Sequence, residues 1–422
     1  MKQKPFQPWR YLTACSLSYL GTGVFMCVNT LVSLSRGMDL AQVSLGLALA
    51  SLTSLVLELP SGMAGDLFGR KRVWMMAAAA QALQLALFLF AGGPVLLLAY
   101  VLNGVSNALI SGTLDALYME GWIHSRGADT LSKASAWNAA AQTGSMAVGS
   151  LAGGVLAALP FFREYTVNLL AVCALRLAAL VWVALMIPAD AGHGRAPRQT
   201  RPSLLRQFMA QGRTAWDAAA ASGPLTLCLL STVALGFGMI GLEAFWKPRL
   251  LELAPAGAQL GPVLGVLSGI SMLGALGGSV LCAQFTKHCH TQRRRILAFL
   301  LTRTLLGAAL LAVACAADIP GFALLFTGYY LTLGMHSTTE DMLLQGAAPD
   351  AARGTLMSVE SLLLQAGVFV SQLVSSAWLL RGSIRALWVL EAAVLLGGTA
   401  LAVGACRRAA RRKAVENPAQ NG

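Results

Sequence analysis

Residues 73–90 read VWMMAAAAQALQLALFLF, a run of apolar residues without a charged side chain. An α-helix needs about 20 such residues to cross the roughly 30 Å of hydrocarbon in a membrane. Similar runs recur at 94–110, 168–187 and 386–403. The 422-residue chain is 56% hydrophobic and only 12% charged. A soluble protein of this length carries more charge on its surface, so the sequence predicts a membrane protein.

The apolar runs predict an all-α fold with twelve transmembrane helices. The alternation of polar and apolar residues that is typical of barrel strands is missing. The first span follows Met1–Arg10 at once, without the small-residue cleavage site of a removed signal peptide. The expected spans are residues 11–33, 40–63, 73–91, 94–117, 134–158, 165–187, 223–246, 260–284, 296–315, 319–343, 355–379 and 384–405.

The distribution of lysine and arginine predicts how the chain is oriented. With twelve spans, the two termini and the loops on their side hold 23 of the 31 basic residues, and the opposite loops hold 6. The remaining two, Arg176 and Arg303, lie within spans. Such an excess marks the cytoplasmic side of a membrane protein. We therefore expect a multi-pass protein of the plasma or inner membrane with both termini in the cytoplasm. The net charge of +13 is explained by topology and by affinity for anionic lipid, so no nucleic-acid partner is implied.

Two parts of the chain resemble each other at an offset of 225 residues. This shift places 111–121 on 336–346 without a gap. Because six spans separate the copies, they share one orientation, as in transporters built from two parallel repeats. The paired residues that agree in type are Thr113 and Thr338, Asp115 and Glu340, Glu120 and Gln345, and Gly121 and Gly346.

The repeat predicts two pseudo-symmetric six-helix bundles. The first is expected at 1–188 and the second at 223–405. The polar, basic segment 189–222 would link them in the cytoplasm, and 406–422 would form a cytoplasmic tail.

The loop between the second and third spans carries a motif rich in glycine and charge. It reads Gly62-Met-Ala-Gly-Asp66-Leu-Phe-Gly69-Arg70-Lys71-Arg72. Gly62 lets two helices approach closely, Asp66 offers a carboxylate to a helix N-terminus, and Gly69 suits a tight turn. The motif resembles the G-x-x-x-D-x-x-G-R-K signature of the major facilitator superfamily, at the loop where that superfamily carries it.

The resemblance implies a secondary transporter whose two bundles rock around a central cavity. It also implies that this loop latches the two halves together in the outward-open state. Part of its basic charge has a simpler explanation in membrane topology. The gating residues expected on this basis are Gly62, Asp66, Gly69, Arg70 and Lys71, with Asp115 or Glu120 as acid partners.

A second resemblance concerns the direction of transport. Gly149-Ser-Leu-Ala-Gly153-Gly154 is similar to the core of the motif found in the superfamily's drug/proton antiporters. Ser150 replaces the proline of that motif, and Tyr100 stands about where the antiporters carry an arginine. Close packing of helices through small residues explains the same glycines equally well.

Polar side chains recur at helical spacing inside several spans. Such side chains are costly in hydrocarbon, so repeated stripes are expected to face a water-filled cavity or one another. Hydrogen bonds between helices are the alternative for any single amide. The residues expected along the cavity are Asn29, Asn103, Asn107, Ser111, Asn138, Gln142, Thr332, His336 and Gln365.

Charged residues inside or near the spans have separate expected roles. Glu340 and Asp341 lie near a span end and are expected to act in gating. Glu243, followed by Trp246, is expected either at an external gate or at a site that attracts cations. His336 and Glu340 are candidates for proton coupling, because histidine titrates near neutral pH. For Glu391, Arg176 and Arg303 we expect buried pairing.

These features favour secondary active transport of a small, amphiphilic solute, with efflux coupled to protons. No nucleotide-binding loop, metal-ligand spacing or nucleophile–base constellation appears in the sequence, so we expect no cofactor, no metal and no enzymatic activity. Uptake of a sugar or organic acid by symport is the alternative, and a membrane-embedded receptor is the alternative outside transport. The expected partners are a small-molecule substrate, protons or another coupling ion, and membrane lipid, with the protein a monomer.

Overall fold

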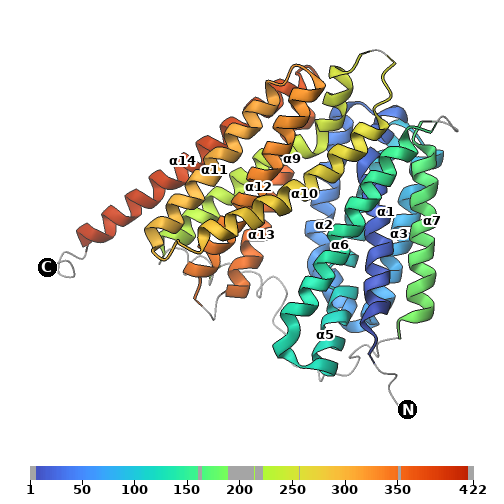
Figure 1. Ribbon diagram of the computed structural model, residues 1–422, viewed down its shortest axis with the longest axis horizontal. Coiled ribbons are helices and arrows are strands. Elements are labelled where there is room, and N and C mark those ends of the chain that lie inside the picture. The colour runs from blue at the N-terminus through green and yellow to red at the C-terminus, as the bar shows by residue number, and fades with distance from the viewer. Residues whose placement is uncertain are drawn as a thin grey trace. The chain divides into compact units, whose positions relative to one another are not determined.

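The computed structural model describes residues 6–159, 164–188, 213, 222–255, 257–349 and 353–416. Within these ranges the side chains of Leu59, Asp66, Ala128 and residues 409–416 are not described. Nearly all of the expected linker 189–222 lies outside the described residues. Among the described residues all regular structure is helical, which confirms the all-α prediction (Figure 1).

The chain divides into two compact units by its internal contacts. One unit comprises Met1–Gln199 with Ala254–Met272, and the other comprises Thr200–Leu253 with Leu273–Gly422. The long helices of the first unit are α1 (Pro8–Ser35), α2 (Leu40–Phe68), α3 (Arg70–Phe90), α4 (Leu97–Ile110), α5 (Leu114–Arg126), α6 (Leu131–Ala157) and α7 (Thr166–Met186). The remaining long helices are α9 (Gly223–Leu253), α10 (Gly261–Thr286), α11 (Gln292–Ala314), α12 (Ile319–Ala347), α13 (Arg353–Trp378) and α14 (Ile384–Glu416).

Ten helical segments of the described chain are long and apolar enough to cross a membrane. The helices α6 and α12 are not among them, although each has 27 or more residues. Both carry one of the polar stripes, which lowers their mean hydropathy. Large apolar side chains point outward, such as Phe90, Leu185 and Leu324 at 88%, 76% and 74% exposed. Such an exterior suits lipid.

The fourth predicted span, 94–117, is not one continuous helix. It begins with a 3-10 turn at Gly93–Leu96, continues as α4, and breaks at Ser111–Thr113 before α5. Gly112 adopts a φ of +68°, a conformation that glycine reaches without the steric cost of a side chain. The break places Asp115 in the first turn of α5. At the other end of the chain, α14 continues to Glu416, past the expected span end at 405.

Equivalent helices pack in equivalent pairs within the two units. In the first unit α1 packs on α6 and α7, and α3 packs on α4. In the second unit α9 packs on α13 and α14, and α11 packs on α12. These pairs correspond under a shift of six spans, as an internal repeat requires.

Glycines set how closely these helices approach. A side chain added at Gly149 on α6 would meet the backbone of Leu20 on α1. In the second unit, a side chain at Gly236 on α9 would meet the backbone of Leu364 on α13. Backbone contact of this kind supplies much of the packing energy between helices in lipid. The glycines that resemble an antiporter motif therefore have a packing role here.

Gly149→Ala is expected to destabilise the purified protein by about 1–3 kcal/mol, because the added methyl group overpacks the contact between α1 and α6. Gly144→Ala on the same helix is the matched control, since a side chain there meets no atom within 4 Å. Unfolding in detergent, followed by intrinsic tryptophan fluorescence, measures both. Equal stability of the two variants would contradict the packing assignment.

Candidate functional site

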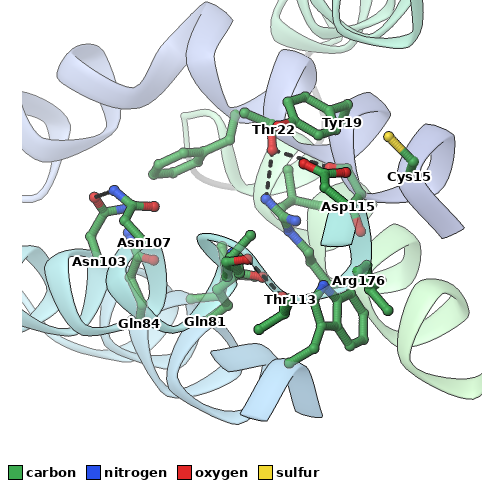
Figure 2. A pocket seen from close by; sticks show the side chains of 17 residues that line it. Cys15, Tyr19, Thr22, Gln81, Gln84, Asn103, Asn107, Thr113, Asp115 and Arg176 are labelled. Carbon is green, nitrogen blue, oxygen red and sulfur yellow. Dashed lines mark hydrogen bonds between the residues drawn. The ribbon is translucent and has the colours of Figure 1, made fainter. Parts of the chain in front are cut away.

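The first unit contains a cavity of about 230 Å³. Side chains from α1, α3, α4, α5 and α7 point into it (Figure 2). Its wall is mixed, with amides, hydroxyls and two charged groups beside aromatic and aliphatic side chains. The lining residues are Cys15, Ser18, Tyr19, Thr22, Phe25, Trp74, Gln81, Gln84, Leu85, Asn103, Asn107, Ile110, Thr113, Leu114, Asp115, Val172 and Arg176.

Four amides form part of this wall. Asn107 donates to the side-chain oxygen of Asn103 at 3.1 Å, one turn away on α4. Gln81 and Gln84 face the cavity from α3 and are 9% and 6% exposed. The two asparagines were predicted from the sequence to line a cavity, and the two glutamines were not. Their spacing of three residues within an apolar run was the available signal.

Arg176 brings a positive charge to the cavity from α7. Its Nη2 donates to Thr22 Oγ1 on α1 at 2.7 Å. Among the described residues no carboxylate lies within 4 Å of the guanidinium. The structure thus gives Arg176 a hydroxyl partner at a cavity wall, where the sequence suggested a buried ion pair.

Asp115 brings a negative charge to the same cavity from the first turn of α5. Its carboxylate accepts from Asn138 at 3.1 Å and from Gln142 at 3.3 and 3.4 Å. Both amides lie on α6, so the polar stripe of that helix holds Asp115 in place. Asn138 and Gln142 are not among the cavity-lining residues.

The loop motif forms a set of contacts on the first unit. Gly69 has a φ of +88° and ends α2 directly before α3 begins. Arg70 Nη1 lies 2.6 Å from Glu120 Oε1, so Glu120 rather than Asp115 is the acid beside it. Lys71 donates to the carbonyls of Ala184 and Ile187 at the end of α7. The side chain of Asp66 lies outside the described residues, and Gly62 is exposed.

Other residues expected along a cavity are not among those that line this one. Asn29 accepts from the backbone N–H of its neighbour Thr30 at 2.8 Å. Thr332 donates to the carbonyl of Tyr329 on its own helix. Ser111 is exposed at the break before α5, and Gln365 is exposed on α13. Asp341, which was expected to act in gating, is exposed on α12.

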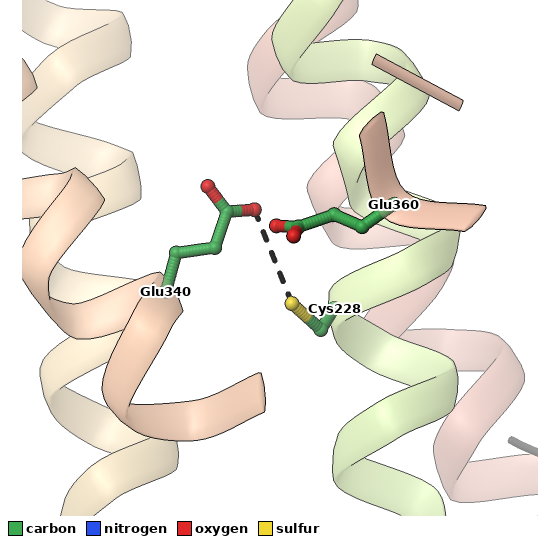
Figure 3. Close-up of side chains that lie close together, drawn as sticks. All are labelled: Cys228, Glu340 and Glu360. Carbon is green, nitrogen blue, oxygen red and sulfur yellow. Dashed lines mark hydrogen bonds between the residues drawn. The ribbon is translucent and has the colours of Figure 1, made fainter. Parts of the chain in front are cut away.

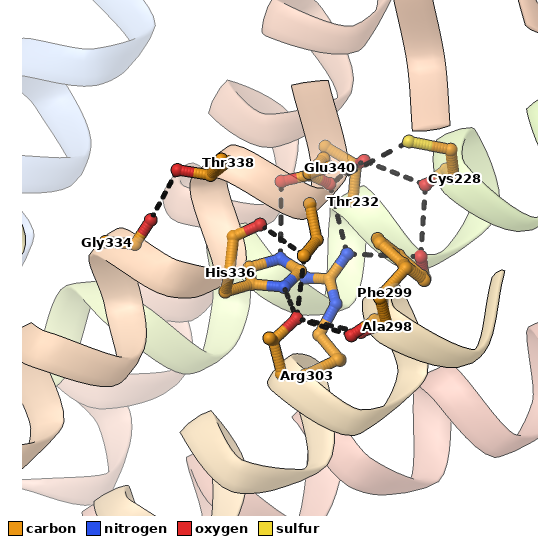
Figure 4. Close-up of polar contacts among 12 residues, drawn as sticks. Cys228, Thr232, Ala298, Phe299, Arg303, Gly334, His336, Thr338 and Glu340 are labelled. Carbon is orange, nitrogen blue, oxygen red and sulfur yellow. Dashed lines mark hydrogen bonds and ion pairs between the residues drawn. The ribbon is translucent and has the colours of Figure 1, made fainter. Parts of the chain in front are cut away.

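The second unit contains a buried ion pair between α11 and α12 (Figure 4). Arg303 Nη2 donates to Glu340 Oε1 at 3.1 Å and to Ser231 Oγ at 3.2 Å. Thr232 donates to the same carboxylate oxygen at 3.2 Å, and His336 Nε2 lies 3.3 Å from the other oxygen. Arg303 is fully buried and Glu340 is 7% exposed. The pairing expected for Arg303 is thus present, with Glu340 as its partner.

Glu360 brings a second acid to this network from α13 (Figure 3). The Cys228 Sγ and one carboxylate oxygen each of Glu340 and Glu360 all lie within 4.8 Å of one another. These groups are of the kind that can bind a metal ion, but Glu340 Oε1 already accepts from Arg303 and Thr232. The Glu360 carboxylate thus lies beside that of Glu340, which is ion-paired with Arg303.

Two further acids of the second unit are held by hydroxyl groups. Tyr330 donates to Glu243, and Ser371 donates to the fully buried Glu391 at 3.2 Å. Trp246 is buried and packs on Phe326 with ring centroids 4.9 Å apart. Glu243, expected either at an external gate or at a site that attracts cations, thus accepts a hydrogen bond from a tyrosine.

Arg303→Met is expected to destabilise the protein by about 3–5 kcal/mol, because it leaves the buried Glu340 carboxylate without its counter-ion. The double variant with Arg303→Met and Glu340→Gln should lose less free energy of unfolding than the two single variants lose in sum, since the pair is then removed together. Unfolding of the unchanged protein, the two single variants and the double variant in detergent measures this coupling. Additive losses would show that the two side chains do not stabilise each other.

Comparisons with known proteins agree with this architecture. A search of curated protein sequences finds no match. Among solved structures, the nucleoside transporter NupG matches with a TM-score of 0.73 at 12% identity, covering 95% of this chain and 98% of that one. The POT family transporter PepTSo gives 0.71 at 12%, covering 97% and 99%. A D-xylose-proton symporter gives 0.64 at 14%, covering 93% and 95%. At these identities the likeness establishes the fold.

The family follows from the sequence itself. The sequence model of the Major Facilitator Superfamily matches residues 11–372, which is most of the chain. Paired bundles, the loop motif and a polar cavity within apolar helices are all consistent with that match. The chain therefore belongs to the Major Facilitator Superfamily and is a secondary transporter rather than an enzyme.

Proposed function

We propose that this transporter moves a small amphiphilic solute and couples that movement to protons. The observation that carries the proposal is the cavity of the first unit, whose wall combines amides and charges with Phe25, Trp74 and Leu85. Its volume of about 230 Å³ lies below the roughly 300–1,000 Å³ of pockets for drug-sized ligands. This favours a solute with about one ring over a large drug.

The network around Arg303 supports the proposed coupling to protons. Glu340 and His336 lie side by side, and both can take up a proton. Protonation of Glu340 would remove the charge that holds Arg303, and ionisation of Glu360 would offer Arg303 a second acceptor. Binding and release of a proton would thus change which helix the buried guanidinium prefers. A change of this kind can bias a two-state equilibrium.

We propose efflux as the direction and the cytoplasm as the side of both termini. The asymmetry of basic residues supports the orientation. The partial antiporter motif gives weaker support to efflux, because its glycines also serve to pack α6 on α1. Uptake by symport is therefore an outcome that the flux measurement must be able to show.

The proposal is tested with purified protein in liposomes that contain a pH-sensitive dye. Benzenesulfonate, benzyltrimethylammonium and L-phenylalanine serve as single-ring probes of different charge. We expect at least one of them to drive a protein-dependent proton flux, whose sign reports antiport or symport. If none of the three moves with a proton flux, the proposal is wrong.

Glu340→Gln and His336→Asn are each expected to abolish the dependence of transport on the pH gradient. Exchange of labelled for unlabelled probe should persist, because exchange at equal pH requires no net proton movement. Asp341→Asn is the matched control, since Asp341 is exposed on the same helix beside Glu340. Gradient-driven transport that survives in both variants would remove the network from the coupling mechanism.

A further inference from the structure

The cavity of the first unit holds two opposite charges that do not form an ion pair. The Arg176 guanidinium and the Asp115 carboxylate both border it (Figure 2). No ion pair within 4 Å joins them. Two opposite charges in a site of low dielectric attract each other, yet these two groups stay more than 4 Å apart. A solute that carries both charges can therefore contact both groups.

Arg176 has most of its hydrogen-bonding capacity left. A guanidinium carries five N–H donors in a fixed fork that matches a carboxylate. In the described part of the chain only one hydrogen bond from this side chain is seen, to Thr22. The oxygen of Thr22 is itself held, because its hydroxyl donates to the carbonyl of Ser18 at 3.1 Å. Arg176 is therefore positioned from one side and open on the other.

Asp115 is likewise fixed on one side. Asn138 and Gln142 approach it from α6 and orient the carboxylate. Amide donors position the group without neutralising its charge. Asp115 thus remains available as an acceptor for an ammonium group.

Aromatic side chains lie along the same cavity wall. Tyr19, Phe25 and Trp74 all line the cavity. Phe25 packs on the buried Phe88 with ring centroids 5.6 Å apart, which fixes its position. An apolar group of about one ring would be shielded from water here.

We infer that the cavity binds a small zwitterion, with its carboxylate at Arg176, its ammonium group at Asp115 and an apolar side group on the aromatic wall. This inference rests on the proposed function and names the chemical class of its substrate. An amphiphilic amino acid has these three parts in one molecule of suitable size. The site has no net charge of its own, which suits a solute with no net charge.

The test compares three probes with the same phenylalkyl skeleton. They are L-phenylalanine, 3-phenylpropionate and 2-phenylethylamine, which carry both charges, the anion alone and the cation alone. Binding to the purified full-length protein is measured at neutral pH by the shift of its thermal unfolding midpoint. We expect L-phenylalanine to bind at least tenfold more tightly than either analogue.

The variants assign each charge to its residue. Arg176→Gln should weaken the binding of L-phenylalanine at least tenfold while leaving the binding of 2-phenylethylamine unchanged. Asp115→Asn should weaken the binding of L-phenylalanine at least tenfold while leaving the binding of 3-phenylpropionate unchanged. Arg10→Gln is the matched control, because Arg10 donates to the carbonyl of Met186 outside the cavity. The unfolding midpoint without ligand reports whether each variant is folded, and where Arg176→Gln is not folded, Arg176→Met removes the same charge.

Three results would overturn the inference. They are an analogue that binds as tightly as L-phenylalanine, selectivity that survives Arg176→Gln, and no binding of any probe. A proton-coupled flux of benzenesulfonate or benzyltrimethylammonium in liposomes would then support the proposed function and exclude only the zwitterion as the substrate. Absence of flux for every probe would instead remove the proposed function itself.

Discussion

Hydrocarbon offers no hydrogen bonds, so every polar group within the membrane must find a partner in the protein or face a water-filled space. The other features of this structure follow from that constraint. Helices satisfy their own backbone, glycines bring them into contact, and polar side chains collect where other polar groups meet them. Arg303 and Arg176 represent the two solutions. Arg303 is enclosed with Glu340 and Ser231, whereas Arg176 lies at a cavity wall beside Thr22.

The same constraint made the fold predictable from the sequence. Long apolar runs have one stable form in lipid, and the family match and the structural likenesses confirm the all-α fold. The break at Ser111–Thr113 was missed because an apolar window carries no information on backbone conformation. Gly112 takes a positive φ there, and a glycine in an apolar run has no mark that distinguishes a break from close packing.

The candidate site was predictable only where its residues share one helix. Asn103 and Asn107 lie one turn apart, so their common face could be read from the spacing. Contacts between helices could not, because they depend on how each helix is rotated about its axis. The pairing of Arg303 with Glu340 and the approach of Asn138 to Asp115 are of this kind. So is the place of Arg176, which spacing alone did not separate from that of Arg303.

By the same constraint, the polar wall of the cavity in the first unit requires that water or a solute can reach it. Two native cysteines of α1 test it directly, because Cys15 lines the cavity and Cys27 is fully buried. Variants that keep only one of these cysteines are exposed to a water-soluble maleimide in detergent, and the rate of labelling is measured by mass spectrometry. We predict labelling of Cys15 at least tenfold faster than that of Cys27. Equal rates would mean that the reagent reaches Cys15 no better than Cys27, and would contradict a cavity that is open to a solute.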